Sequence, residues 1–333
     1  MPAAAPSSNE RQRLAAVRKA KLMGTPAEAR FDKITRCAAE ITDMPMAALD
    51  LVGEKLAWLK SVYGFHGIEG LRKDSYCHHT VLGNEICVIR DARTDPRVFD
   101  SKLAQIWVFY AGVPLRFENQ QVGVLCVGDS KARDLSPEKL KALRDLASDA
   151  ERELRSVKLS NSQIALAGTG DELDMSARID LATHGWNRNA IMELLTQEFR
   201  GTLAGSEPIG LLMAEIDHFG GLAEKYGRAA ADEFLLMTAI QLRAYLKSTD
   251  SLGRYADNQF MAVLPGLTGK NMTFQVEAIR RAVSKMNVQI KGAAILLSCS
   301  LGCAVSQGGE SRDQLIKRAT QDLYRAGLWR KPN

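Results

Sequence analysis

The segment Arg254-Tyr255-Ala256-Asp257-Asn258-Gln259-Phe260 lies between two strand-like runs, Ser251 to Tyr255 and Phe260 to Leu264, and Pro265-Gly266 follows the second run. Apolar and aromatic residues flank a short polar tip. Asp and Asn in that tip tolerate the left-handed backbone that hairpin turns use. The segment therefore predicts a tight β-hairpin.

The sequence around this hairpin alternates between strand-like and helix-like runs. Such alternation predicts an α/β sandwich, with helices packed on a sheet that contains the hairpin. The expected strands are Pro208 to Ile216 and Ala294 to Val305, and the expected helices are Leu222 to Lys247 with a break at Gly227, Val276 to Met286 and Asp313 to Ala326.

The hairpin resembles the signature Arg-Tyr-Gly-Gly-Asp/Glu-Glu-Phe of the diguanylate cyclase (GGDEF) family, which joins two GTP molecules into cyclic di-GMP. Asp180 to Arg188 is similar to the family segment Asp-x-Leu-Thr-Gly-Leu-x-Asn-Arg, and Ser300 to Ala304 and Asp322 to Ala326 match further segments. The resemblance covers about Asp180 to Lys331. It implies a nucleotide-cyclase-like sandwich whose reaction needs two domains and divalent metal.

The acidic residues that the family signature uses to bind metal have been replaced by amides in this sequence. The resemblance places metal ligands at the first acid of an Asp-x-Asp-x-Phe segment, here Glu215, and at the third signature residue, here Asn258. Mg²⁺ binds amide oxygens poorly as sole partners, and Asp257 could substitute only through a register shift or a distorted turn. We expect no functional catalytic residue, no bound metal and no cofactor, with Mg²⁺ required only if cyclase activity remains. The degenerate signature is Ala256, Asp257, Asn258, Gln259 and Phe260, and the vestigial metal and nucleotide site comprises Glu215, Ile216, Asp217, Phe219, Asp232, Asn258, Gln259 and Lys331.

Further family contacts are missing. Gly220 and Ala223 stand where the family has Lys and a guanine-binding Asn, and Gly327 replaces a Lys near the C-terminus. The Arg-x-x-Asp motif through which cyclic di-GMP inhibits family members is reduced to Lys247 and Asp250, which we interpret as a vestigial inhibitory site. Lys keeps the charge but loses the two-pronged geometry of a guanidinium group.

The N-terminal half shows a different order of elements. It reads as two helices, Asn9 to Met23 and Ala27 to Ile41, then strands and one short helix, Asp74 to Leu82. This order, with Tyr110 to Leu115 and Gly123 to Val127, resembles a bacterial GAF domain over about Thr25 to Arg155. The resemblance implies an antiparallel sheet with helices on one face and a small-molecule pocket on the other. The expected strands are Met46 to Val52, Leu56 to Tyr63, Ile86 to Ile89, Tyr110 to Leu115 and Val122 to Val127.

The pocket of this domain is expected to bind an unknown small ligand. Cys77-His78 superficially resembles the pair by which photoreceptor GAF domains attach a bilin, and His79 with Cys126 are conceivable metal ligands. The simpler interpretation treats both cysteines as buried small residues, and we favour it because the Cys and His spacing fits no metal site. The pocket candidates are Cys77, His78, His79, Tyr110 and Cys126.

A long helix is expected to connect the two domains. It begins with the Ser136 cap and Pro137. Its apolar positions follow a heptad pattern that predicts a parallel dimer seam once the helix leaves the GAF body beyond Ala150, although packing on the domain's own sheet explains the first turns equally well. The seam comprises Leu140, Leu143, Ala147, Ala150, Leu154, Val157, Asn161 and Ile164.

Length and composition fit this two-domain interpretation. The chain has 333 residues, 46% of them hydrophobic, and a dispersed net charge of +5 that does not suggest nucleic-acid binding. No apolar run is long enough to span a membrane, and Met1 to Arg13 does not resemble a signal peptide. The six cysteines lack CxxC spacing and favour reduced thiols in the cytoplasm.

The sequence predicts a cytoplasmic, homodimeric α/β (α+β) signalling protein. Its expected parts are a helical extension (1–24), a GAF domain (25–136), a connecting coiled-coil helix (137–170) and a degenerate GGDEF domain (171–333). The leading hypothesis is a non-catalytic regulator that binds an effector or an active cyclase. The alternatives are an active diguanylate cyclase with an atypical site that uses Glu215 and Asp257, and a receptor for cyclic di-GMP or GTP that uses Lys247 or Asp232.

Overall fold

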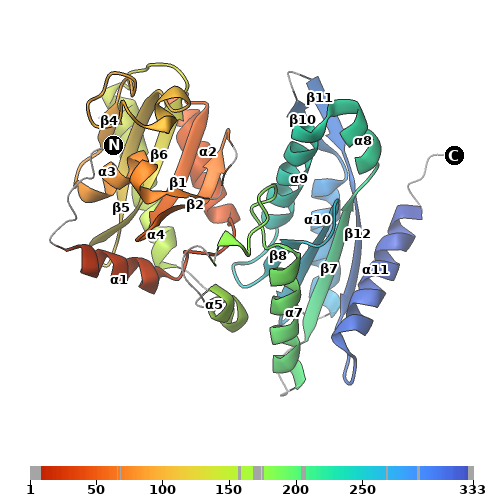
Figure 1. The fold of residues 1–333 in the computed structure, drawn as a ribbon. Helices are drawn as coiled ribbons and strands as arrows, with labels where there is room; N and C mark the ends of the chain where they lie inside the picture. The colour runs from red at the N-terminus through yellow and green to blue at the C-terminus, as the bar shows by residue number, and fades with distance from the viewer. Residues whose placement is uncertain are drawn as a thin grey trace. The chain divides into compact units, whose positions relative to one another are not determined.

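The chain divides into two compact units, which are described separately (Figure 1). The first unit comprises Met1–Val157 with Ala167–Ala177, and the second comprises Lys158–Leu166 with Arg178–Asn333. The computed structural model describes residues 9–65, 67, 69–156, 159–167, 174, 176–203, 208–267, 269–290 and 293–328. Within these ranges, no helix combines the length and the apolar character needed to cross a membrane.

The first unit is built on a six-stranded antiparallel sheet with the strand order β3-β2-β1-β6-β5-β4. Strands β1 and β2 have the bounds that the sequence predicts, because their apolar residues are bounded by clear turn residues. The short edge strand β3 was not expected. The strands are β1 (Met46–Val52), β2 (Leu56–Tyr63), β3 (Glu69–Leu71), β4 (Cys87–Ile89), β5 (Phe109–Phe117) and β6 (Gln120–Asp129).

Helices cover both faces of this sheet. α2 (Ala29–Thr42) packs on β1 and β2 and on α4 (Pro137–Arg155), which also contacts β5. α3 (Tyr76–Leu82) packs on β5 and β6 from the other face, where it contributes to a separate core cluster. Two 3-10 turns, Arg72–Asp74 and Lys102–Gln105, flank this second face. The antiparallel sheet expected from the sequence is therefore present, but helices pack on both of its faces and not on one alone.

The N-terminal helix α1 (Glu10–Ala20) is an integral part of the first unit. Its buried Arg13 donates hydrogen bonds to the carbonyl oxygens of Val52, at 2.6 Å, and Gly53, at 3.2 Å. Arg13 and Arg72 both bind the carboxylate of Glu10, at 2.9 and 2.6 Å. These contacts fasten the helix to the turn between β1 and β2.

The bounds of helix α4 contradict the continuous helix that was predicted to carry the dimer seam. Its N-terminus matches the sequence, since the Ser136 side chain accepts a hydrogen bond from the Lys139 amide. The helix ends at Arg155, and α5 (Asn161–Ala167) is a separate helix, so the expected continuous helix through Ile164 is wrong. Leu154 is 1% exposed and packs inside the first unit, so the helix does not leave the domain body beyond Ala150. Leu143, Ala147 and Ala150 are likewise buried, Leu140 is half-buried, and Val157 lies outside the described residues.

The second unit contains a four-stranded antiparallel sheet with the order β12-β7-β9-β8. The predicted hairpin is present as β8 (Ser251–Arg254) and β9 (Gln259–Pro265), and β7 (Ile209–Ile216) lies beside it. The single strand expected over Ala294 to Val305 is two strands, β11 (Ala293–Leu297) and β12 (Cys299–Val305). β11 pairs with β10 (Met286–Ile290), which was not predicted.

Helices pack on both faces of this sheet. α9 and α10 enclose a core with β7, β9 and β12 that includes Phe234, Ile279 and Phe260. On the other face α11 lies so close to β12 that a Cβ atom on Gly302 would be 2.0 Å from the Leu323 amide nitrogen. As predicted, Gly227 breaks the helix after β7. The helices are α7 (Arg188–Leu203), α8 (Phe219–Tyr226), α9 (Arg228–Arg243), α10 (Gly269–Val283) and α11 (Arg312–Leu328).

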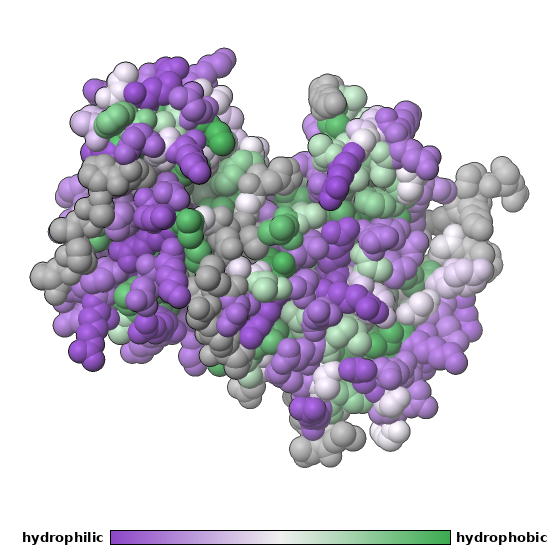
Figure 2. Space-filling model, viewed as in Figure 1, coloured by the Kyte–Doolittle hydropathy of each residue, from purple (hydrophilic) through white to green (hydrophobic). Residues whose placement is uncertain are grey.

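Each unit thus buries its own apolar residues. Figure 2 shows that hydrophilic residues cover most of the displayed face of both units and that apolar residues form only small patches there. This distribution is expected for domains with separate hydrophobic cores.

Candidate functional site

The hairpin of the second unit closes over a three-residue tip. The Tyr255 and Ala256 amides both donate to the Gln259 carbonyl, at 2.8 and 3.2 Å. Ala256, Asp257 and Asn258 all have negative φ angles, so the expected left-handed backbone is absent. The turn therefore forms without the conformational freedom of glycine.

Arg254 fixes the position of this tip. Its guanidinium group donates to the carbonyl oxygens of Ala256, at 3.3 Å, and Asp257, at 2.7 Å. It also pairs with the Asp180 carboxylate at 3.2 Å, and Asp180 accepts hydrogen bonds from the Thr183 amide and hydroxyl. The two segments that carry the family resemblance, far apart in the sequence, therefore support each other.

Two side-chain amides lie where the family would have carboxylates. Glu215 at the end of β7 is paired in register with Gln259 on β9. Gln259 Nε2 donates to Glu215 Oε2 at 2.6 Å, and Asn258 Nδ2 donates to the Ile216 carbonyl oxygen at 3.1 Å. Each amide thus directs N–H hydrogens at an oxygen that could otherwise face a cation.

The second acid of the segment is also engaged. Asp217 accepts hydrogen bonds from the Ser298 hydroxyl, at 2.6 Å, and the Ser300 hydroxyl, at 2.7 Å. These contacts tie the end of β7 to β12 and the turn before it. Asp217 is therefore held by the protein's own donors.

The residues near Glu215 do not fit Mg²⁺. Mg²⁺ requires several anionic or carbonyl oxygens in near-octahedral geometry. Here one carboxylate remains, and it accepts an amide hydrogen bond. Asp257 is exposed at the hairpin tip, and Asp232 is half-exposed on α9.

The remaining predicted site residues have structural positions or lie outside the described chain. Phe219 packs against the core at the start of α8. Gly327 lies near the Ser300 hydroxyl, where the family's Lys is replaced by a residue without a side chain. Lys331 lies outside the described residues.

Lys247 and Asp250 form a local turn. The Asp250 carboxylate accepts a hydrogen bond from the Lys247 amide at 2.8 Å, and the Asp250 amide donates to the Lys247 carbonyl at 3.0 Å. Burial raises the pKa of Asp250. The Lys247 side chain is exposed. The carboxylate of the predicted vestigial inhibitory site is therefore used to cap its own turn.

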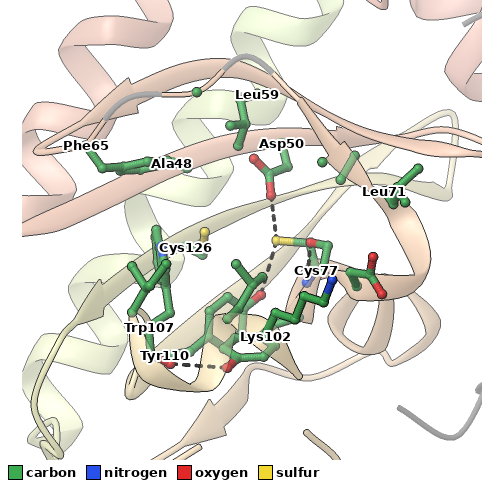
Figure 3. Close-up of a pocket in the computed structure, with 18 residues that line it drawn as sticks. Ala48, Asp50, Leu59, Phe65, Leu71, Cys77, Lys102, Trp107, Tyr110 and Cys126 are labelled. Carbon is green, nitrogen blue, oxygen red and sulfur yellow. Dashed lines mark hydrogen bonds between the residues drawn. The ribbon is translucent and has the colours of Figure 1, made fainter. Parts of the chain in front are cut away.

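A cavity of about 440 Å³ lies in the first unit, between the sheet and α3 (Figure 3). Three of the five predicted pocket residues, Cys77, Tyr110 and Cys126, line it. His78 and His79 do not. The His78 Nδ1 atom accepts a hydrogen bond from Arg72 at 3.0 Å, and burial together with Arg72 lowers the pKa of His78 to about 4.

Sequence models of two protein families match the two units. The model described as "GAF domain" matches residues 26–154, and the model described as "Diguanylate cyclase, GGDEF domain" matches residues 177–331. The chain carries a GAF domain followed by a GGDEF domain. The recognition made from the sequence is confirmed for both domains.

Known relatives of the chain include diguanylate cyclases. The chain is 30% identical to diguanylate cyclase DgcP of Pseudomonas aeruginosa over 140 residues, which are 42% of this chain and 21% of that protein. It is 25% identical to diguanylate cyclase A of Treponema denticola over 219 residues, 64% of this chain and 55% of that protein. The chain therefore spans at most about half the length of these relatives. A structural match is the Pseudomonas aeruginosa diguanylate cyclase SiaD in complex with its activator SiaC, with 23% identity, a TM-score of 0.45, and coverage of 58% of this chain and 71% of that chain.

The cavity of the GAF domain contains a residue that the sequence analysis missed. Asp50 on β1 is 3% exposed, and its Oδ2 atom accepts a hydrogen bond from the Cys77 thiol at 2.6 Å. Burial raises the pKa of Asp50 to about 7, and the hydrogen bond from Cys77 partly opposes this effect. The available signal was a single acid inside the apolar strand Met46–Val52.

Proposed function

We propose that the protein is a non-catalytic regulator in cyclic di-GMP signalling. In this proposal the GAF domain binds a small ligand, and the GGDEF domain acts by binding a protein partner instead of converting GTP. The GAF and GGDEF domain matches and the related diguanylate cyclases support the signalling role. Six free cysteines agree with a reducing cytoplasm as its location.

The hydrogen bond from Gln259 to Glu215 carries this proposal. An amide placed 2.6 Å from a carboxylate oxygen must present its NH₂ group, because its own oxygen would be repelled there. The second amide does the same toward the Ile216 carbonyl. A divalent cation would have to displace both donors, and in exchange it would gain one carboxylate, that of Glu215, beside two neutral amides. Loss of charge stabilisation in phosphoryl transfer commonly costs about 10²-fold or more per group.

The preserved scaffold favours a binding role. Arg254, Asp180 and Thr183 keep the hairpin in place although its chemistry has changed. We propose that this surface pairs with a protein effector or an active cyclase, and that the protein itself forms homodimers. Four residues of the predicted helical seam, Leu143, Ala147, Ala150 and Leu154, are buried within the chain, so we propose that the homodimer uses other surfaces. Sedimentation velocity measures this directly.

The decisive assay is incubation of the purified protein with GTP and Mg²⁺ or Mn²⁺, followed by chromatography for cyclic di-GMP. We expect no product from the wild type. An Asn258→Asp/Gln259→Glu variant tests whether restored carboxylates recover metal-dependent turnover. Product from the wild type that disappears in Glu215→Ala would refute the proposal. Loss in Asp257→Ala as well would point to the atypical cyclase.

The regulatory half of the proposal needs its own measurement. We expect the protein to change the rate of an active diguanylate cyclase when the two are mixed, or to bind an effector in a manner that requires the hairpin. An Arg254→Ala variant, which releases the tip, provides the comparison. An effect that is identical in wild type and variant would argue against the hairpin surface as the binding site.

A further inference from the structure

The cavity of the GAF domain has an unusual polar corner. Most of its lining is apolar or aromatic, including Leu59, Phe65 and Trp107. Figure 3 shows Asp50 directed toward Cys77, with the Cys126 sulfur beside them. The Asp50 carboxylate and two thiols therefore meet at one place in a mostly apolar cavity, whose lining also includes the polar residues Asp74, Ser75 and Lys102. Its volume, about 440 Å³, lies within the range of small-molecule sites.

The fold brings these three residues together from three elements. Ala48 on β1 is paired with Cys126 on β6, so Asp50, two residues further along β1, projects from the same face of the sheet. Cys77 enters from the first turn of α3, where Ser75 caps the helix by accepting a hydrogen bond from the Cys77 amide at 3.2 Å. All three residues are buried.

One oxygen of the corner is left without a partner. Asp50 Oδ2 is bound by the Cys77 thiol, but the buried Oδ1 atom has no hydrogen-bond partner among the described residues. An unsatisfied buried oxygen of a carboxyl group is destabilising, because its hydrogen bonds to water have been lost and not replaced. The observation points to a missing cation or donor at this place and is independent of the clustering of the thiols.

The ligand atoms have metal-like spacing. The two sulfurs and a carboxylate oxygen all lie within 4.8 Å of one another. In a tetrahedral zinc site, bond lengths of about 2.0–2.3 Å place neighbouring ligand atoms roughly 3.3–3.8 Å apart. The three ligand atoms are therefore at most about 1–1.5 Å further apart than the ligands of such a site. Within the described part of the chain, no other group of three His, Cys, Asp or Glu residues has such spacing.

We propose that Asp50, Cys77 and Cys126 form a buried site for a thiophilic divalent cation, Zn²⁺. Two thiolates and a carboxylate are ligands that Zn²⁺ prefers, and a cation there gives the carboxylate the partner that the protein does not supply. On binding, the two thiol protons leave to solvent as the sulfurs become ligands. These three side chains would hold the ion and leave one tetrahedral position for water or a small anionic or sulfur-containing ligand from the cavity. This inference does not depend on the function proposed for the GGDEF domain.

The test is metal uptake by the full-length protein. Bound metal is first removed from the protein with a chelator under reducing conditions. The protein is then titrated with Co²⁺, whose visible bands and thiolate charge-transfer band report tetrahedral sulfur ligation. A titration with Zn²⁺ follows. We expect one ion per chain, displacement of Co²⁺ by Zn²⁺, and a Zn²⁺-dependent rise in the unfolding temperature of the GAF domain.

Variants locate the ion. Cys77→Ser and Cys126→Ser should each reduce the charge-transfer intensity by about half and weaken Zn²⁺ binding on the order of 100-fold or more, and Asp50→Asn should weaken binding at least 10-fold. Cys303→Ser, in the GGDEF domain, is the matched control and should leave binding unchanged. Cys126→Ser is nearly isosteric, so it keeps the test informative if Asp50→Asn does not fold.

Two results would overturn the proposal. One is the absence of stoichiometric uptake by the reduced wild-type protein at micromolar metal. The other is uptake that persists without change in folded Cys77→Ser and Cys126→Ser proteins, which would place the ion elsewhere. Neither result would affect the GTP assay, so the two proposals can fail separately.

Discussion

The GAF cavity and the GGDEF hairpin differ in how their acidic side chains are hydrogen-bonded. In the hairpin site, Glu215 and Asp217 accept hydrogen bonds from Gln259 and from two serines. In the cavity, one buried oxygen of Asp50 has no partner among the described residues, and the carboxylate lies beside two thiols. The acids of the first site accept hydrogen bonds from its own side chains, whereas one acceptor of the second site does not.

This difference separates a site whose acids are already hydrogen-bonded from a site with an unpaired buried carboxyl oxygen. Buried polar groups are normally satisfied by the protein, and an exception suggests a functional site. A site that has become internally satisfied retains the fold of its family but offers little to a metal or a phosphate. The comparison therefore agrees with the two proposals made above, ligand binding by the GAF domain and a non-catalytic role for the GGDEF domain.

The largest expected effect comes from Gly302→Ala, which disturbs the wall behind the hairpin site. The added Cβ atom would meet the Leu323 amide nitrogen at 2.0 Å and the Ala319 carbonyl oxygen at 2.4 Å. Both are backbone atoms and cannot move aside easily, so we expect the GGDEF domain to lose on the order of 3 kcal/mol of unfolding free energy. Calorimetry that resolves separate transitions of the two domains measures the loss.

The matched control is Gly308→Ala, whose added Cβ would have no neighbour within 4 Å. It should change stability by no more than about 0.5 kcal/mol. A GAF transition that shifts together with the GGDEF transition in Gly302→Ala would show that the domains do not unfold separately.

The second prediction restores the lost carboxylates. Asn258→Asp/Gln259→Glu removes two hydrogen bonds and places like charges beside Glu215. We expect the GGDEF domain to lose about 2 kcal/mol without metal and to recover part of it with Mg²⁺. Thermal unfolding with and without Mg²⁺ checks this. An equal response of the wild type would show that the native site already binds the ion.

The third prediction concerns the pH dependence of the GAF domain. Burial opposes ionisation of Glu10, but hydrogen bonds from Arg13 and Arg72 prevail and lower its pKa from 4.5 to about 2. The carboxylate therefore stabilises the fold above pH 4.5, and this contribution is lost as the pH falls from 4.5 toward 2. Glu10→Gln should cost on the order of 1 kcal/mol at pH 7 and flatten that decline in acid titrations. An unchanged acid profile would contradict the assigned network.

The smallest effect is expected from Asp257→Ala. The side chain is exposed at the hairpin tip, and Arg254 contacts the Asp257 carbonyl oxygen, which the substitution retains. Stability should change by less than about 0.5 kcal/mol, and any response to Mg²⁺ should stay as in the wild type. A substantial loss of metal response would instead support Asp257 as a replacement ligand.

Local patterns in the sequence were sufficient for much of the fold. Alternation and turn residues predicted β1, β2 and the hairpin, and the Ser136-Pro137 cap marked the start of α4. The heptad pattern was misleading because an apolar stripe has the same spacing whether it packs on a partner or on its own sheet. The β10–β11 hairpin was missed because Met286 was read as the end of a helix and Ala294 to Val305 as one continuous strand.

The candidate sites depended on contacts that no local pattern reveals. Replacement of two carboxylates by Asn258 and Gln259 was visible in the sequence, but their role as donors to Glu215 and Ile216 required the strand register. The group Asp50, Cys77 and Cys126 was even harder to predict from the sequence. These residues are distant in the chain and meet only where β1, β6 and α3 pack together.

The most direct test of the central claim is a Mn²⁺ titration followed by electron paramagnetic resonance, in the presence of GTP, with wild type and Glu215→Gln compared. Mn²⁺ prefers the same oxygen ligands as Mg²⁺. If the amides close the hairpin site, both proteins will give the same signal as GTP with Mn²⁺ alone. A bound Mn²⁺ species that appears in the wild type and disappears in Glu215→Gln would contradict the account.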